Sequence, residues 1–80
     1  MHEARLCLSL IRIAEETLAR DGGTRILGLE LEVGELSGVA PEALQAAFPI
    51  CANGTQAENA ALRCHRAPGR GLVLRALEVT

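Results

Sequence analysis

The chain has 80 residues and a formal net charge of −2, from eight arginines, no lysine and ten acidic residues. A chain of this length forms one small domain that buries only about 60% of its unfolded surface, which leaves little room for a deep catalytic cleft. With no basic excess and Phe48 as its one aromatic residue, it lacks the charged and stacking surfaces that bind nucleic acids or anionic membranes. We therefore expect neither nucleic acid nor membrane as a partner.

The N-terminal segment carries charges at Arg5, Arg12 and Glu15. These interrupt any apolar stretch that could form a signal peptide or a membrane span, so we expect a cytoplasmic protein. The chain has three cysteines, which are Cys7, Cys51 and Cys64. They cannot all pair and form no Cys-x-x-Cys motif, so we expect buried small apolar residues rather than a disulfide framework.

The first predicted element is an amphipathic helix from about Ala4 to Arg20. Its apolar residues recur at helical spacing and predict one buried face: Cys7, Leu10, Ile11, Ala14 and Leu18. Asp21-Gly22-Gly23 ends this helix, because glycine accepts the left-handed conformation that closes helix ends.

Alternation from Thr24 to Val33 predicts a half-buried strand. Its apolar face comprises Leu27, Leu29, Leu31 and Val33. Glu30 and Glu32 lie on the other face, which we expect to be in water.

A turn-rich connection from 34 to 40 precedes a second helix. Pro41 suits the first helical position, where a missing N–H costs nothing. The apolar stripe comprises Leu44, Ala47, Phe48 and Cys51. Pro49 lies inside the pattern and removes a backbone hydrogen bond, so we expect a kink or an early end near Phe48.

Two further strands follow Asn53-Gly54. In the first, Leu62 and Cys64 alternate with Arg63 and His65. Residues 67–70 read Ala-Pro-Gly-Arg and predict a tight turn, and the last strand runs from 72 to 80. The fold class is therefore α+β, with two helices on one face of a three-stranded sheet, in the order helix-strand-helix-strand-strand within a single domain of residues 1–80.

The last strand places Val73 and Leu74 on opposite faces of the sheet. It therefore offers apolar surface on both sides, which indicates a bulge or a contact between subunits.

Met1-His2-Glu3 places an amine, an imidazole and a carboxylate within one short reach. The Met1 amine, the His2 amide and the His2 imidazole can close a chelate, with a fourth ligand from Glu3 or its amide. Such a nitrogen-rich square-planar set suits nickel(II) or copper(II). Taken alone, however, His2 is better explained as a chance exposed histidine.

The order of segments resembles the HypA/HybF family of hydrogenase nickel-insertion chaperones. The matching segments are Met1-His2-Glu3, Leu29 to Ser37, Pro41 to Leu44, Gly54-Thr55 and Leu77-Glu78-Val79. The resemblance implies a nickel metallochaperone with Met1, His2 and Glu3 as ligands. It also implies two partners, a HypB-type GTPase and the [NiFe]-hydrogenase large subunit.

Two departures from the family pattern stand out. Family members often carry an acidic residue just ahead of the proline, where this chain has Ala40, and Glu42 is better explained by its place at the positive end of a helix dipole. The family also inserts a zinc loop with two Cys-x-x-Cys motifs between its last two strands, where this chain has only the turn at 67–71. Cys64 and His65 supply at most two ligands, from opposite strand faces, so structural zinc is not expected. The sequence does not say whether this loop was lost naturally or by engineering.

Three hypotheses follow. The first is a nickel metallochaperone, and the second is a metal-independent interaction scaffold for maturation partners. The third, a small enzyme, lacks paired acids, an activated thiol and a nucleotide motif, so no catalytic residue is predicted. The short turn at 67–71 also favours a homodimer formed by exchange of the C-terminal strand.

Overall fold

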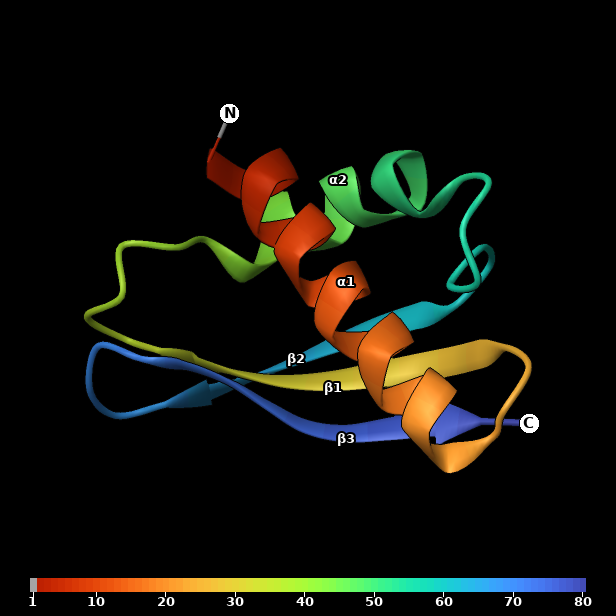
Figure 1. Cartoon of the computed structure of the whole chain (residues 1–80). Helices are drawn as coiled ribbons and strands as arrows, with labels where there is room; N and C mark the ends of the chain where they lie inside the picture. Colours follow the sequence, from red (N-terminus) through yellow and green to blue (C-terminus); the bar gives the residue numbers. More distant parts are fainter. Residues whose placement is uncertain (1) are drawn as a thin grey trace.

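The computed structural model describes residues 2–80, with side chains from Glu3 onward. The chain forms helix α1, strand β1, helix α2 and strands β2 and β3, with bounds α1 His2–Asp21, β1 Ile26–Gly34, α2 Pro41–Ala52, β2 Ala61–Ala67 and β3 Leu72–Val79. Both helices lie on one face of the sheet (Figure 1). The predicted α+β class and element order are confirmed.

Strand β1 lies at the centre of the sheet, which has the order β2-β1-β3. It pairs with β2 in parallel and with β3 in antiparallel fashion. Its leucines at 29 and 31 are fully buried beneath the helices. The apolar residues of β3 opposite β1, Leu72, Leu74 and Leu77, pack against the same core. One layer of apolar side chains therefore joins the sheet to both helices.

Helix α1 buries the face that the sequence predicted. All five of its predicted core residues are at most 7% exposed: Cys7, Leu10, Ile11, Ala14 and Leu18. After α1, Gly22 has a φ of 77°, and the Gly23 amide donates to the Leu18 carbonyl at 3.1 Å. The positive φ of Gly22 and this hydrogen bond close the helix as expected. Among residues 2–80, neither helix combines the length and the apolar content that a membrane crossing requires.

The prediction that Leu27 faces the core is wrong. Its side chain is 49% exposed, while Ile26 is 1% exposed and takes the core position. The cause is a register shift between Ile26 and Gly28 in the β1–β3 pair, because an extra residue in one strand reverses the faces on which the following side chains lie. Strict alternation could not reveal this irregularity.

Of the two alternatives expected near Phe48, a kink or an early end of α2, the early end is wrong. The helix continues through Pro49 to Ala52. Phe48 and Ala52 are each 1% exposed and lie one turn apart on the core face. Burial of both residues keeps the helix intact, although the proline lacks one backbone donor.

The open face of the sheet carries charged residues in ion pairs. On this face Glu30 accepts a hydrogen bond from His65 at 2.6 Å, and Arg63 pairs with Glu78 at 2.9 Å. The other glutamate of β1, Glu32, pairs with Arg75 at 3.2 Å. The predicted polar face is therefore confirmed. Its ion pairs are half-exposed and add little to the stability of the fold.

The connection between β2 and β3 crosses the end of β1, because these two strands flank β1 on opposite edges. Gly69 has the predicted positive φ, 92°. Three backbone hydrogen bonds fasten the connection, from the amides of Gly34, Glu35 and Leu36 to the carbonyls of Gly71, Ala67 and Gly69, each at 2.8 Å. This segment therefore joins β2 to β3 across the end of β1 and is not a hairpin loop between neighbouring strands.

Phe48→Ala should lower the free energy of unfolding by about 3–5 kcal/mol, because it removes a fully buried aromatic ring and leaves a cavity. Ile50→Ala, on the same helix but 78% exposed, is the matched control and should change it by less than about 0.5 kcal/mol. Urea unfolding followed by circular dichroism measures both. Equal losses in the two variants would contradict the described core.

Gly34→Ala should destabilise the crossing of residues 67–71 over the end of β1. The added Cβ would lie 2.4 Å from the Gly69 carbonyl oxygen and 2.9 Å from that of Gly71. We expect a loss of about 1–3 kcal/mol, as in other overpacked sites. Gly71→Ala is the control, since nothing lies within 4 Å of its added Cβ. The same urea titration decides, and an unaffected Gly34→Ala would contradict the close crossing.

Candidate metal centre

The candidate nickel ligands lie at the start of α1. Helix α1 begins at His2, and Glu3 is an acidic residue in its first turn. Met1 and the side chain of His2 lie outside the described residues, so the ligand set of Met1, His2 and Glu3 stays a prediction. The structure does establish the backbone setting of His2 and Glu3.

This setting places the backbone amides of His2 and Glu3 in the first turn of α1. The first four N–H groups of an α-helix have no partner within the helix, so a chelate through these amides leaves the helical hydrogen bonds of α1 intact. The positive end of the helix dipole also favours the negative charge of a carboxylate or a deprotonated amide at this position.

A pocket of about 380 Å³ lies beside this first turn. Its walls come from α1, which supplies Glu3, Arg5, Leu6 and Ser9, and from the loop before α2, which supplies Ser37, Gly38 and Val39. The loop is fixed locally, since the Ser37 hydroxyl accepts a hydrogen bond from the Val39 amide at 3.2 Å. The sequence did not predict this pocket, because its two walls are more than twenty-five residues apart along the chain.

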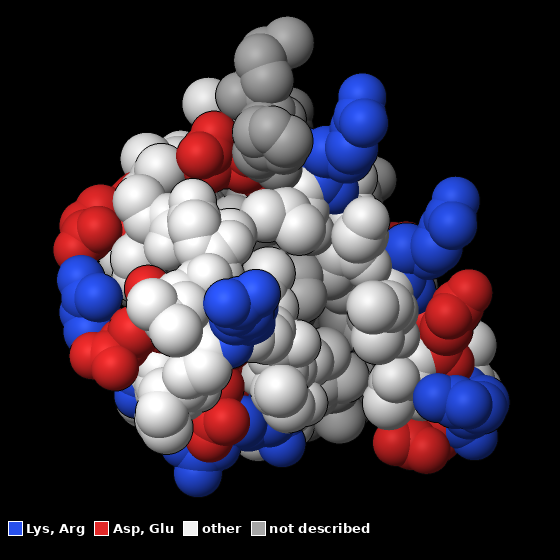
Figure 2. Space-filling model, turned by 90° about the vertical axis from the view of Figure 1, so that its left-hand side faces the viewer, with Lys and Arg blue, Asp and Glu red and all other residues white. Residues whose placement is uncertain are grey.

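Figure 2 shows the face of the molecule that lies on the left-hand side of Figure 1, where the loop before α2 runs. Uncharged side chains cover most of its centre, and its arginines are separated by uncharged and acidic residues. Leu36, in the loop before α2, is 68% exposed. This end is therefore suited to contact with another protein more than to an extended anion.

The loop before α2 supplies no extra carboxylate next to the proline. Ala40 is the N-cap of α2 and makes no side-chain capping bond. Glu42 is exposed in the first turn of α2, and its charge helps to raise the pKa of Cys64, after burial of that thiol. Glu42 is not among the residues that line the pocket beside Glu3. Its position agrees with the helix-dipole explanation.

The pair Cys64 and His65 does not fit a zinc site. Cys64 packs against the core, whereas His65 lies on the open face and hydrogen-bonds to Glu30. Among the side chains described from residue 3 onward, no group of three or more His, Cys, Asp or Glu is placed to hold a metal ion. A closed zinc site needs four converging ligands.

The three thiols lie closer together than the sequence indicated. Cys7 is fully buried, and Cys51 and Cys64 are partly buried against the same core. Burial, followed by the nearby Cys51 and Cys64 thiols, raises the pKa of Cys7 to about 11. Cys7 and Cys51 both lie in the contact between α1 and α2, where each thiol donates a hydrogen bond to a backbone carbonyl of the other helix.

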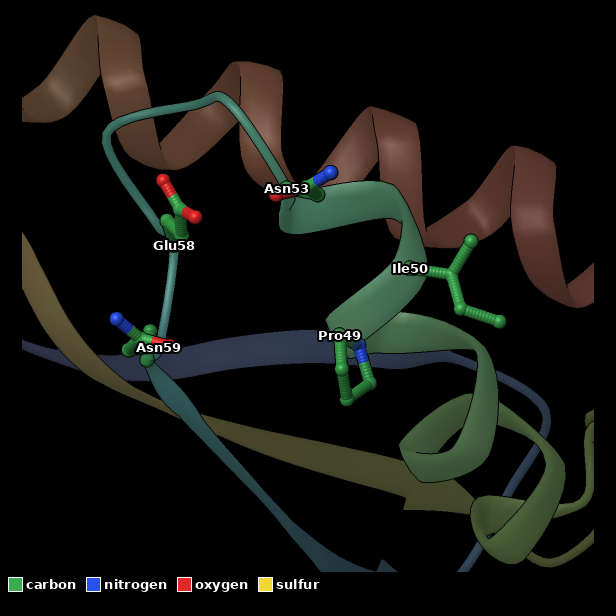
Figure 3. A pocket seen from close by; sticks show the side chains of 6 residues that line it. Pro49, Ile50, Asn53, Glu58 and Asn59 are labelled. Atoms are coloured by element: carbon green, nitrogen blue, oxygen red, sulfur yellow. The ribbon is translucent and has the colours of Figure 1, made fainter.

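A second pocket, of about 590 Å³, lies between the end of α2 and the loop that leads to β2 (Figure 3). It is lined by Pro49, Ile50, Asn53, Glu58, Asn59 and Ala60. One carboxylate and two amides do not form a nickel-selective donor set, since nickel prefers nitrogen-rich ligands. The pocket beside Glu3 remains the better neighbour for a metal.

Comparison with known proteins decides the family. Residues 1–73 match the family model described as "Hydrogenase/urease nickel incorporation, metallochaperone, hypA". The chain belongs to the HypA family.

Two relatives show the extent of the likeness, and both are named "Hydrogenase maturation factor HypA". This HypA-family chain is 48% identical over 71 residues to the protein of Deinococcus radiodurans, covering 89% of this chain and 59% of the relative. Its identity to the protein of Geobacter sulfurreducens is 46% over 71 residues, covering 89% and 62%. The chain thus spans about six tenths of the length of these relatives.

The fold is also that of a HypA protein. The "Solution structure of the Ni metallochaperone HypA from Helicobacter pylori" superposes with a TM-score of 0.74 at 13% identity, covering 98% of this chain and 92% of that chain. At this identity the likeness shows the fold alone. The family description names a metallochaperone, in agreement with the expectation that the HypA-family chain is not an enzyme.

Proposed function

We propose that this HypA-family chain binds nickel(II) through Met1, His2 and Glu3 and delivers the ion during [NiFe]-hydrogenase maturation. The position of His2 and Glu3 in the first turn of α1 is the observation that carries the proposal. It places them at the positive end of the helix dipole, which favours a carboxylate or a deprotonated amide, beside a pocket that Glu3 helps to line. Nickel is the cargo of this site.

Release follows from the same position. The proposed ligands come from the first residues of α1, so we propose that a receiving protein replaces them one at a time at this end of the helix. The proposed partners are a HypB-type GTPase and the large subunit of [NiFe]-hydrogenase, carried over from the family. The exposed side chain of Leu36, in the loop before α2, is suited to such contact.

A second candidate function is a metal-independent scaffold for maturation partners. The exposure of Leu36 favours it, since an apolar side chain at 68% exposure serves protein binding whether or not a metal is present. Nickel binding at the N-terminus separates the two functions.

Nickel titration of the tag-free chain should show one-to-one binding, with the absorbance of square-planar nickel. His2→Ala should abolish it, because the imidazole and the chelate ring are lost together, and His65→Ala is the control that should bind like the natural chain. Equal binding by His2→Ala and the natural chain, or no binding by either, would favour the scaffold.

Nickel affinity should fall as the pH drops from 8 to about 5.5, because protons compete with nickel for the amine and imidazole nitrogens. Isothermal titration across this range measures the change. A flat affinity would contradict an amine and imidazole ligand set.

We also propose a homodimer in which two chains exchange β3. In the described chain β3 pairs with its own β1, and exchange would keep the same pairs between chains. Sedimentation should show dimers at high concentration, and a flexible glycine-serine insert in the 67–71 loop should restore monomers. Only monomers of the natural chain at high concentration would contradict exchange.

A further inference from the structure

Two thiols meet across the contact between α1 and α2. The Cys7 thiol donates a hydrogen bond to the Leu44 carbonyl of α2 at 3.5 Å. In the reverse direction, the Cys51 thiol donates to the Ala4 carbonyl of α1 at 3.7 Å. Each thiol therefore lies against the other helix, and both belong to one contact between α1 and α2.

We propose that Cys7 and Cys51 are a modification site, a dithiol that a low-molecular-weight disulfide such as oxidised glutathione converts into a disulfide between α1 and α2. This inference goes beyond the proposed function and does not rest on nickel binding. It requires that the sulfurs approach to about 2 Å, starting from side chains that lie in the same contact between α1 and α2.

The exposure of the two thiols sets the order of events. Cys51 is partly exposed, whereas Cys7 is 0% exposed. The Cys51 thiolate attacks oxidised glutathione, forming a mixed disulfide and releasing one glutathione thiolate. In the mixed disulfide the Cys51 sulfur is uncharged, so it places no negative charge beside Cys7.

Cys7 then completes the exchange. Its thiol gives its proton to solvent, and its thiolate attacks the Cys51 sulfur and releases the second glutathione. Two protein thiols and one oxidised glutathione thus become one protein disulfide and two glutathione molecules. Because the raised pKa of Cys7, about 11, keeps it protonated at neutral pH, the second step should be slow and should accelerate as the pH rises.

Cys64 is expected to keep its thiol. It lies on β2 and its pKa is raised, chiefly by burial and then by Glu42. Cys7 and Cys51 instead lie in the contact between the two helices. The bond is therefore directed to the two helices, where it ties α1, one turn after Glu3, to the last turn of α2.

Trypsin separates the three cysteines, because arginines at 5, 12, 25, 63 and 66 place them on the distinct peptides 6–12, 26–63 and 64–66. The folded chain is incubated with oxidised glutathione, remaining thiols are alkylated, and the digest is analysed by mass spectrometry. We expect peptide 6–12 linked to 26–63, with the thiol count falling from three to one per chain and returning to three after reduction.

Three variants sharpen the test. Cys64→Ser should give the same linked pair, whereas Cys7→Ala should stop at a glutathione adduct on peptide 26–63. Cys51→Ser, which changes a partly exposed side chain and so preserves the fold, should give no link. A link to peptide 64–66, a stable adduct without a link in the natural chain, or three unreacted thiols would each overturn the proposal.

Discussion

The pairing of β1 on both of its edges is the constraint on which this fold depends. Because β1 receives β2 on one edge and β3 on the other, the chain between these strands must cross the end of β1. Gly34 makes this crossing possible, since any Cβ there would meet the carbonyl of Gly69. The short connection at 67–71 then replaces solvent at the end of β1 with three backbone hydrogen bonds.

The same constraint positions the candidate metal centre. With β1 held at the centre, its buried leucines fix the layer against which α1 and α2 pack. Helix α1 lies on this layer, and its first turn extends beside the loop that follows β1 (Figure 1). The pocket at Glu3 forms between these two segments, so the site depends on the sheet although its candidate ligands come from the first residues of the chain.

Helix packing also explains why the thiols differ in chemistry. Burial in the α1–α2 contact raises the pKa of Cys7 and keeps it protonated, while Cys51 on the opposite helix stays partly open to solvent. The contact that stabilises the fold therefore leaves one cysteine shielded from solvent and the other partly accessible.

The sequence by itself determined the element order, the buried face of α1 and the charged face with Glu30 and Glu32, because these follow from local periodicity. The N-terminal ligand set stays a prediction, drawn from atoms that are adjacent along the chain. Only the tertiary structure decided that Leu27 turns outward, that α2 continues past Pro49 and that a pocket forms beside Glu3. The first depends on a register shift against β3, the second on burial of Ala52 and the third on the packing of α1 beside the loop before α2, and local pattern encodes none of these contacts.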